Sequence, residues 1–235
     1  MKNLSLFSGF LSLFYVLFPF NIKAQSTIQV IYREKTMIDE NKIRQNLKNK
    51  IENTARLQDL LFRLKEMDTV YHYYTLTISK GYSICKYDST VGRGSKTTPI
   101  IYKDHVKKII ILDYPHIKGG QGVKPFPTLS SWEICYDKTL KIGGYRSFKA
   151  TRLDKAGHRI EVWFTPDIPI SDGPNSSAGL PGLVLRRITE GSINKYITNA
   201  IQINITKKDS IITLPNKKQL SVEEFTELAR RSFGY

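Results

Sequence analysis

From Val70 onward, this sequence of 235 residues consists of one strand-like segment after another, and helical spacing returns only near the C-terminus. Most segments alternate apolar residues with polar ones, which is typical of half-buried strands. Turn-forming residues separate neighbours, as at Lys80-Gly81 and at 154–157. Consecutive strands joined by short turns pair antiparallel, so the sequence predicts an antiparallel meander with an exposed polar loop at 89–98. The predicted strands cover 27–34, 70–79, 82–87, 106–112, 132–136, 145–153, 158–164, 183–188 and 196–205.

Two segments have helical spacing. Over residues 39–67 apolar residues recur every three or four positions, and Asp39 can cap the start of one long helix or of two shorter ones. Near the C-terminus, Ser221 and Glu224 have the spacing of a capping box in front of an apolar stripe. We therefore predict an α+β fold that is mostly β: a curved antiparallel sheet or half-barrel, with an N-terminal helical segment and a C-terminal helix packed on it.

The N-terminus has the pattern of a secretory signal peptide. Lys2 precedes an apolar run from Leu4 to Phe20, and Ile22 and Ala24 occupy the positions that signal peptidase inspects. We expect residues 1–24 to be removed and 25–235 to form a single domain with a helical insert near 39–67. The alternative is a retained membrane anchor. Because no other apolar run is long enough to span a membrane, we do not expect an integral membrane protein.

The charge balance is strongly basic, with 36 Lys and Arg against 21 Asp and Glu, a formal net charge of +15. In a cytoplasmic protein, such a balance would favour nucleic acid as the binding partner. For an exported protein, the expected partners are anionic lipids, glycans or acidic proteins. The basic residues occur as scattered pairs without a long run, which favours a solvated surface.

Known catalytic and metal-binding patterns are missing from the sequence. The four His share no metal-ligand spacing with the two Cys or with one another. A nucleophile elbow, a phosphate loop and a dinucleotide fingerprint are also missing, so the sequence implies neither cofactor nor metal. Cys85 and Cys135 lie in predicted strands. After export they would be in an oxidising compartment, so we expect either a disulfide between them or two buried free thiols.

The most informative stretch is Phe164 to Leu185, FTPDIPISDGPNSSAGLPGLVL. Its four prolines exclude a helix and a central strand, so residues 165–182 must form an ordered extended loop or edge. Pro181-Gly182 suits the central positions of a type II turn. This stretch either seats the strand that follows it or forms a rigid lip over a ligand or partner site.

At this stretch the sequence resembles a known family. Gly179 to Leu185, GLPGLVL, looks like the signature of the GLPGLI family of secreted Bacteroidota proteins, and the matching motifs extend over residues 132–186. Ser147 stands where the family pattern leads us to expect Cys. The resemblance implies export and a shared β-rich fold but no settled activity. The predicted meander is also similar to the open half-barrels of periplasmic lipoprotein carriers, which hold acyl chains on a concave apolar face.

These observations favour an exported binding or carrier protein of the periplasm or outer-membrane surface. Its ligand would be a lipid, a peptide or a glycan on the concave sheet. One alternative is a docking or assembly partner of an outer-membrane protein. Another is a hydrolase using Glu161, Asp167 or Asp172, although nothing in the sequence names a catalytic residue. The candidate ligand-binding residues are Trp132, Tyr145 and Trp163 in the wall, with Gly173, Pro174, Gly179, Leu180, Pro181 and Gly182 at the rim.

Overall fold

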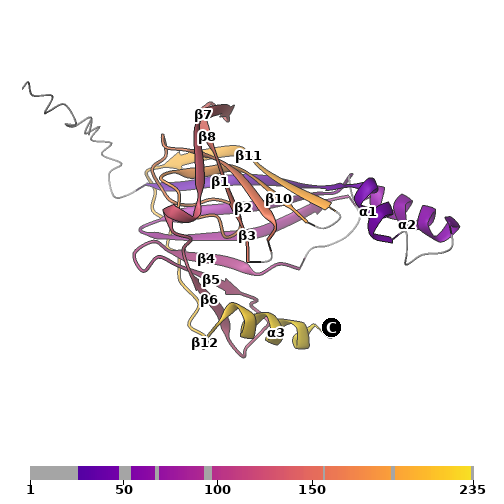
Figure 1. Cartoon of the computed structure of the whole chain (residues 1–235). Helices are drawn as coiled ribbons and strands as arrows, with labels where there is room; N and C mark the ends of the chain where they lie inside the picture. The colour runs from indigo at the N-terminus through magenta and orange to yellow at the C-terminus, as the bar shows by residue number, and fades with distance from the viewer. Residues whose placement is uncertain are drawn as a thin grey trace, which may run out of the picture.

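The computed structural model describes residues 26–47, 54–66, 69–92, 97–155, 157–191 and 194–233. The predicted signal peptide lies outside the described residues. The described chain is mostly β and forms one large, open, curved sheet, as the sequence predicts (Figure 1). Its elements are β1 (Thr27–Ile38), α1 (Glu40–Leu47), α2 (Thr54–Glu66), β2 (Tyr71–Ser79), β3 (Tyr82–Val91), β4 (Ile100–Asp104), β5 (Ile109–Asp113), β6 (Gln121–Pro125), the 3-10 helix η2 (Leu129–Ser131), β7 (Glu133–Ile142), β8 (Tyr145–Leu153), β9 (Arg159–Thr165), β10 (Leu183–Glu190), β11 (Asn194–Thr206), β12 (Gln219–Leu220) and α3 (Val222–Ser232).

The sheet consists of two antiparallel meanders joined side by side. Its strand order is β12-β6-β5-β4-β3-β2-β1-β11-β10-β9-β8-β7, so β1 through β6 form one meander and β7 through β11 form the other. The pairing of β1 with β11 joins them, with Thr27 opposite Thr206 and Ile38 opposite Asn194. The short β12 pairs parallel to β6 at one edge.

Strand β1 lies near the middle of the sheet because its alternating residues fit a half-buried position. Ile28, Val30 and Tyr32 point to the same face and are almost completely buried, whereas Gln29 between them is exposed. The face carrying these three residues is called the inner face below. Both clusters of buried apolar side chains lie on it, one around β1 and β2 and the other around Trp132, Val162 and Phe164.

The N-terminal helical segment forms two helices, one of the two predicted alternatives. The Asp39 Oδ1 atom accepts a hydrogen bond from the Lys42 amide at 3.1 Å, which caps the start of α1 as predicted. Lys65 of α2 pairs with Glu40 of α1 at 2.6 Å. The two helices extend beyond the end of β1 rather than across the sheet, which differs from the expectation that they pack on it (Figure 1).

The C-terminal helix α3 packs at the β6 edge of the sheet, as predicted. Ser221 and Glu224 form the predicted capping box, with the Ser221 side chain accepting from the Glu224 amide. Phe225 is buried against Gly122 of β6 and stacks on Tyr114 with ring centroids 5.7 Å apart. A side chain at Gly122 would meet Phe225 at 2.8 Å, so the glycine permits this close contact.

The structure corrects the sequence prediction on several strands. Residues 89–91, predicted as a loop, continue β3, while β4, β6 and β12 were not predicted. The segment predicted as a strand at 106–112 is a turn up to residue 108 and a strand from Ile109. Strand β4 lacks the alternating apolar pattern used for the prediction, because Lys103 occupies one of its fully buried positions.

The proline-rich segment, residues 166–182, crosses the inner face. The Leu183 amide donates to the Ile168 carbonyl at 3.0 Å, and the Val184 amide donates to the Asp172 carbonyl at 2.8 Å. Ile168 and Ala178 join one apolar cluster and Leu180 joins the other. The segment therefore fills part of the space enclosed by the curved sheet.

Candidate functional site

Trp132 is the aromatic residue at the centre of the candidate site. It follows η2 directly and packs against Val162, Phe164 and Leu180, with 6% of its surface exposed. Its Nε1 atom donates to the Ala178 carbonyl of the proline-rich segment at 3.2 Å. The indole thus has an apolar body in the core and a satisfied polar edge, which holds it rigidly in place.

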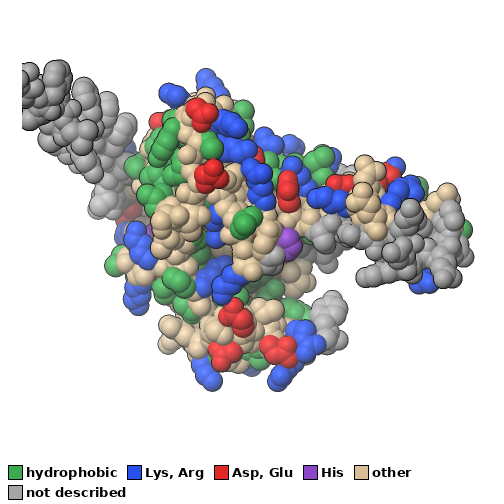
Figure 2. Space-filling model, viewed as in Figure 1, with side chains coloured by type: hydrophobic (Ala, Val, Ile, Leu, Met, Phe, Trp, Pro, Cys, Tyr) green, Lys and Arg blue, Asp and Glu red, His purple; other side chains and the backbone are tan. Residues whose placement is uncertain are grey.

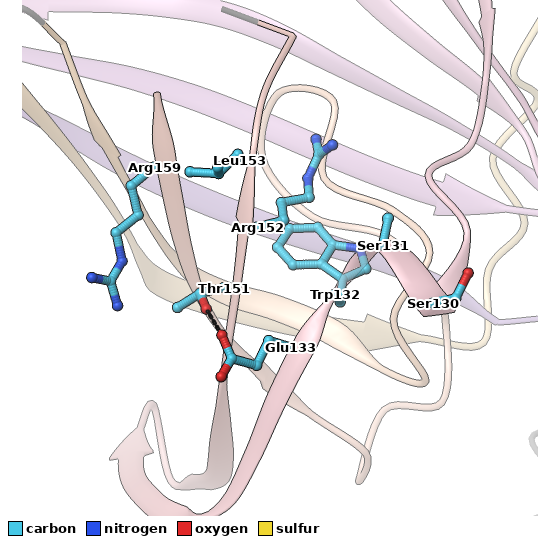
Figure 3. Close-up of a pocket in the computed structure, with 8 residues that line it drawn as sticks. All are labelled: Ser130, Ser131, Trp132, Glu133, Thr151, Arg152, Leu153 and Arg159. Carbon is cyan, nitrogen blue, oxygen red and sulfur yellow. Dashed lines mark hydrogen bonds between the residues drawn. The ribbon is translucent and has the colours of Figure 1, made fainter. Parts of the chain in front are cut away.

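A pocket of about 480 Å³ opens beside Trp132 (Figure 3). Figure 3 shows the Arg152 guanidinium lying alongside the indole, and its Cζ atom is 4.8 Å from the ring centroid. Glu133 accepts a hydrogen bond from the Thr151 hydroxyl at 3.2 Å. The pocket is lined by Ser130, Ser131, Trp132, Glu133, Thr151, Arg152, Leu153 and Arg159.

Arg187 of β10 is a second half-buried cation on the inner face. It lies opposite Val162 in the sheet, and its guanidinium donates to the hydroxyls of Thr189 at 3.1 Å and Ser177 at 3.3 Å. Burial lowers the pKa of Arg187, and repulsion from Arg152 adds to the effect, bringing the pKa to about 10.

Lys124 of β6 is a third inner-face cation. It lies opposite Ile110, which is fully buried in the apolar cluster around β1. Burial lowers the pKa of Lys124 to about 8, with further contributions from the charges of Arg187 and Arg152. For Arg187, the charges of Glu34 and Asp154 oppose this lowering of the pKa.

A buried ion pair fixes the proline-rich segment to the sheet. Lys103 of β4 bonds Asp172, and neither side chain is exposed to solvent. The Asp172 carboxylate also pairs with His105 Nε2 at 2.9 Å and accepts from the Gly173 amide at 2.6 Å. Burial by itself raises the pKa of Asp172, but the charge of Lys103 and the hydrogen bond and charge of His105 outweigh it and lower the pKa to about 2.

The predicted rim residues mostly lie inside the fold. Gly173, Pro174, Leu180 and Gly182 are buried, Gly179 is half-buried, and Pro181 is exposed. They help to fill the enclosed space, and the interpretation of this stretch as a rigid lip over a ligand or partner site stays a prediction. The interpretation that it seats the following strand agrees with the hydrogen bonds from Leu183 and Val184.

Two glycines of the proline-rich segment occupy positions where a larger side chain would clash with the backbone. Gly179 has a φ of +87°, and a Cβ there would lie 2.1 Å from the Pro127 carbonyl oxygen. Gly182 lacks the positive φ that a type II turn requires at its second central position, so that turn prediction is wrong. Glycine is needed there because a Cβ would lie 2.1 Å from the Thr165 carbonyl oxygen.

Trp163 and Tyr145 do not join Trp132 in one wall. Trp163 points to the outer face of β9, since Val162 and Phe164 on either side of it point inward. Its Nε1 atom donates to Glu161 at 3.1 Å, and Lys149 pairs with the same carboxylate at 2.5 Å. Tyr145 packs at the margin of the apolar cluster around β1. Pairing Trp132 with Trp163 in one wall was therefore wrong.

The two thiols are free in the structure. Cys85 is buried on β3 and Cys135 is half-buried on β7, the strand at one edge of the sheet. Burial raises the pKa of Cys85 to about 11, which makes it a poor nucleophile. Ser147, which replaces the Cys expected from the family resemblance, is fully buried, and its hydroxyl has no hydrogen-bond partner among the described residues.

The three carboxylates considered for hydrolysis do not converge. Asp172 is buried beside Lys103, Asp167 is exposed, and Glu161 lies on the outer face with Trp163. A separate cavity of about 500 Å³ has His105 in its wall, together with Ser79 and Ser171. Within the described part of the chain, no three His, Cys, Asp or Glu side chains are grouped so that they could hold a metal ion.

Sequence reasoning missed Lys103, His105, Lys124, Arg152 and Arg187. The signal for Lys103 was its position two residues after Ile101 in IIYKD, which places a lysine on the same face of a strand as a buried isoleucine. Arg152 and Arg187 likewise come two residues after the buried Ala150 and Leu185. The pairing of these charges depends on contacts between distant segments, which one sequence does not provide.

Comparison with known proteins supports the fold and leaves the activity open. A family described as "Protein of unknown function (Porph_ging)" matches residues 154–186, which cover β9, the proline-rich segment and the start of β10. No curated protein matches the chain. None of the helices in the described residues is long and apolar enough to cross a membrane.

Solved structures of PNGF-II are similar to this chain. In the C2 and P21 crystal forms the TM-score is 0.55, with 13% and 14% sequence identity over 88% of this chain. The chain spans about a third of PNGF-II, 33% and 34% in the two forms. An uncharacterized conserved protein from Thermus thermophilus matches with a TM-score of 0.38 at 7% identity, covering 84% of this chain and 91% of its own. At such identities the likeness to PNGF-II shows the fold alone.

Proposed function

We propose that this chain is an exported protein of the cell envelope that binds a ligand in the pocket beside Trp132, at the β7–β8 side of its sheet. Its proposed location is the periplasm or the surface of the outer membrane, and its proposed family is GLPGLI. The signal-peptide pattern and the GLPGLVL motif support the location and the family. The ligand class that we proposed from the sequence is a lipid, a peptide or a glycan.

The observation that carries the proposal is the pocket of about 480 Å³ at Trp132. Its size is within the range of small-molecule sites, and a rigid aromatic residue and Arg152 both line it. Trp132 is fixed by its packing in the core and by its hydrogen bond to the Ala178 carbonyl, so this wall of the pocket is preformed. Preformed sites lose little conformational entropy on binding, which favours a carrier over a segment that folds around its partner.

Docking onto an outer-membrane protein is the weaker candidate. Its proposed contact, the stretch from Gly173 to Gly182, is mostly buried. Lys and Arg side chains are spread over the surface in the view of Figure 2 and form no single basic patch there. Hydrolysis has less support still, because Glu161, Asp167 and Asp172 are separated in the structure.

The two tryptophans provide the test, because one lies at the pocket and the other on the outer face. The Trp163→Phe variant retains Trp132 as its tryptophan reporter, and Trp132→Phe retains Trp163. Each variant is titrated with the small-molecule fraction of a detergent-free envelope extract while tryptophan emission is recorded. We expect a saturable change with the Trp132 reporter and none with the Trp163 reporter. A change confined to Trp163, or no change in either variant, would contradict the proposal.

A further inference from the structure

A second cavity, of about 500 Å³, lies where two hairpin turns of the sheet meet. The turn between β2 and β3 and the turn between β4 and β5 are bonded to each other, because the His105 amide donates to the Gly81 carbonyl at 2.9 Å. The proline-rich segment contributes Pro169 and Ile170 to the wall. This cavity shares no lining residue with the pocket at Trp132, so it is a separate site.

The wall of this cavity combines apolar and basic side chains. Its apolar members are Ile78, Pro169 and Ile170, and its basic members are Lys80, His105 and Lys108. None of the described residues that line it is acidic. Such a wall suits a molecule with an apolar body and a negative group, because the apolar part leaves water and the charge meets a cation.

Two of the cavity lysines occupy backbone conformations that disfavour lysine. Among the described residues three non-glycine residues have positive φ, and Lys80 at 50° and Lys108 at 56° are two of them. Lys80 precedes Gly81 in the two-residue turn between β2 and β3, where positive φ at both positions favours Asn, Asp or Gly. Backbone strain of this kind is common at binding sites. The turn geometry gives no reason for lysine, which leaves the two side chains at the cavity to account for it.

Lys108 has a fixed backbone and an unpaired charge. Its carbonyl accepts from the Phe126 amide at 2.8 Å. The turn before it is ordered by Asp104, whose Oδ1 atom accepts from the Val106 amide at 3.0 Å and the Lys107 amide at 2.8 Å. Within the described residues no hydrogen bond or ion pair involves the Lys108 ammonium. Its ammonium is therefore available to an anion in the cavity.

The other two basic residues of the wall already have carboxylate partners. Lys80 pairs with Asp209 at 2.9 Å, and His105 Nε2 pairs with Asp172 at 2.9 Å. Because the pKa of Asp172 is lowered to about 2, its carboxylate is ionised at neutral pH and only accepts, so His105 Nε2 carries a proton. Neither carboxylate lines the cavity. Lys108 is thus the cation of this wall that is left for a ligand.

We propose that this cavity is a second binding site, for an organic carboxylate with an apolar tail such as a short fatty acid. The tail lies against Ile78, Pro169 and Ile170, and the carboxylate accepts from the Lys108 ammonium. A volume of about 500 Å³ is within the range of small-molecule sites. One unpaired ammonium balances the single charge of a carboxylate better than the charge of a phosphate, which is about −2 at neutral pH.

Isothermal titration calorimetry of residues 25–235 at low ionic strength tests the site with octanoate, acetate and octanol. Octanoate is expected to bind, whereas acetate, which lacks the tail, and octanol, which lacks the charge, should bind at least about tenfold more weakly. Lys108→Gln should weaken octanoate binding by at least about tenfold and leave octanol binding unchanged. Lys107→Gln is the matched control, because this exposed lysine precedes Lys108 in the same turn and does not line the cavity.

Two further variants separate this site from the pocket at Trp132 and from a role in folding. Arg159→Gln changes the pocket at Trp132 and should bind octanoate as the wild type does. Lys108→Gly relieves the backbone strain, so it should raise the thermal unfolding midpoint of the ligand-free protein while it weakens octanoate binding.

Four results would overturn the site. They are no octanoate binding by the wild type, equal binding by Lys108→Gln, an equal loss in Arg159→Gln, and a lower unfolding midpoint for Lys108→Gly. The response of the Trp132 reporter to the envelope extract is measured separately, so failure here leaves the binding function at Trp132 in place.

Discussion

Lys103 and Asp172 form the residue pair on which the position of the proline-rich segment depends. Lys103→Met leaves the Asp172 carboxylate buried without its main counter-charge, and we expect the free energy of unfolding to fall by about 3–5 kcal/mol. The double variant with Asp172→Asn should lose clearly less than the sum of the two single variants. Urea denaturation of all four proteins measures this coupling, and additive losses would contradict the described pair.

The same pair predicts a pH dependence of stability. The pKa of Asp172, about 2 in the folded protein, is below its value of about 3.9 in an unfolded chain. Its contribution to stability is therefore present above about pH 4 and is lost as the pH falls towards 2. The difference in urea midpoint between wild type and Asp172→Asn should shrink over this interval. A difference that stays constant would show that Asp172 titrates normally.

Gly179 tests whether the motif glycines are structural. Gly179→Ala introduces a Cβ at 2.1 Å from the Pro127 carbonyl oxygen, in addition to left-handed backbone strain. The matched control is Gly144→Ala, at φ +91° with nothing within 4 Å of the added Cβ. We expect a loss of about 1–2 kcal/mol for Gly144→Ala from strain alone, and a clearly larger loss for Gly179→Ala. Equal losses in chemical denaturation would contradict the described contact.

At the scale of elements, the capping box of α3 makes a local prediction. Ser221→Ala removes the acceptor for the Glu224 amide and should lower the free energy of unfolding by about 1 kcal/mol. Thr226→Ala is the control, since its hydroxyl bonds the Val222 carbonyl four residues earlier within the helix and contributes little to its stability. Differential scanning calorimetry of both variants provides the comparison. A loss no larger than that of the control would contradict the cap.

Sequence patterns predicted the elements whose signals are local. The capping box, the Asp39 cap and the hairpin at Lys80-Gly81 depend on residues a few positions apart, and each is present in the structure. Strands β4 and β6 were missed because Lys103 and Lys124 occupy inward positions that alternation assigns to apolar residues. The type II turn was wrong because close backbone approach, rather than positive φ, explains Gly182.

At the scale of the whole molecule, the sequence predicted a curved, mostly antiparallel sheet but not the pairing that joins its two meanders. The pairing of β1 with β11 joins segments that are more than 150 residues apart, and no local pattern encodes it. The candidate pocket lies within the second meander, between η2, β7, β8 and β9. Trp132 was predicted from its residue type alone, whereas its contacts with Arg152 and with the Ala178 carbonyl join segments that are distant in the sequence.

The central claim is that this fold holds a ligand in the pocket beside Trp132. Native mass spectrometry of residues 25–235, purified without detergent from the periplasm of its own host, tests it most directly. The account predicts a co-purifying mass of lipid, peptide or glycan size, which dissociates on unfolding. A clean ligand-free mass from such a preparation would contradict the binding function and favour docking on another protein.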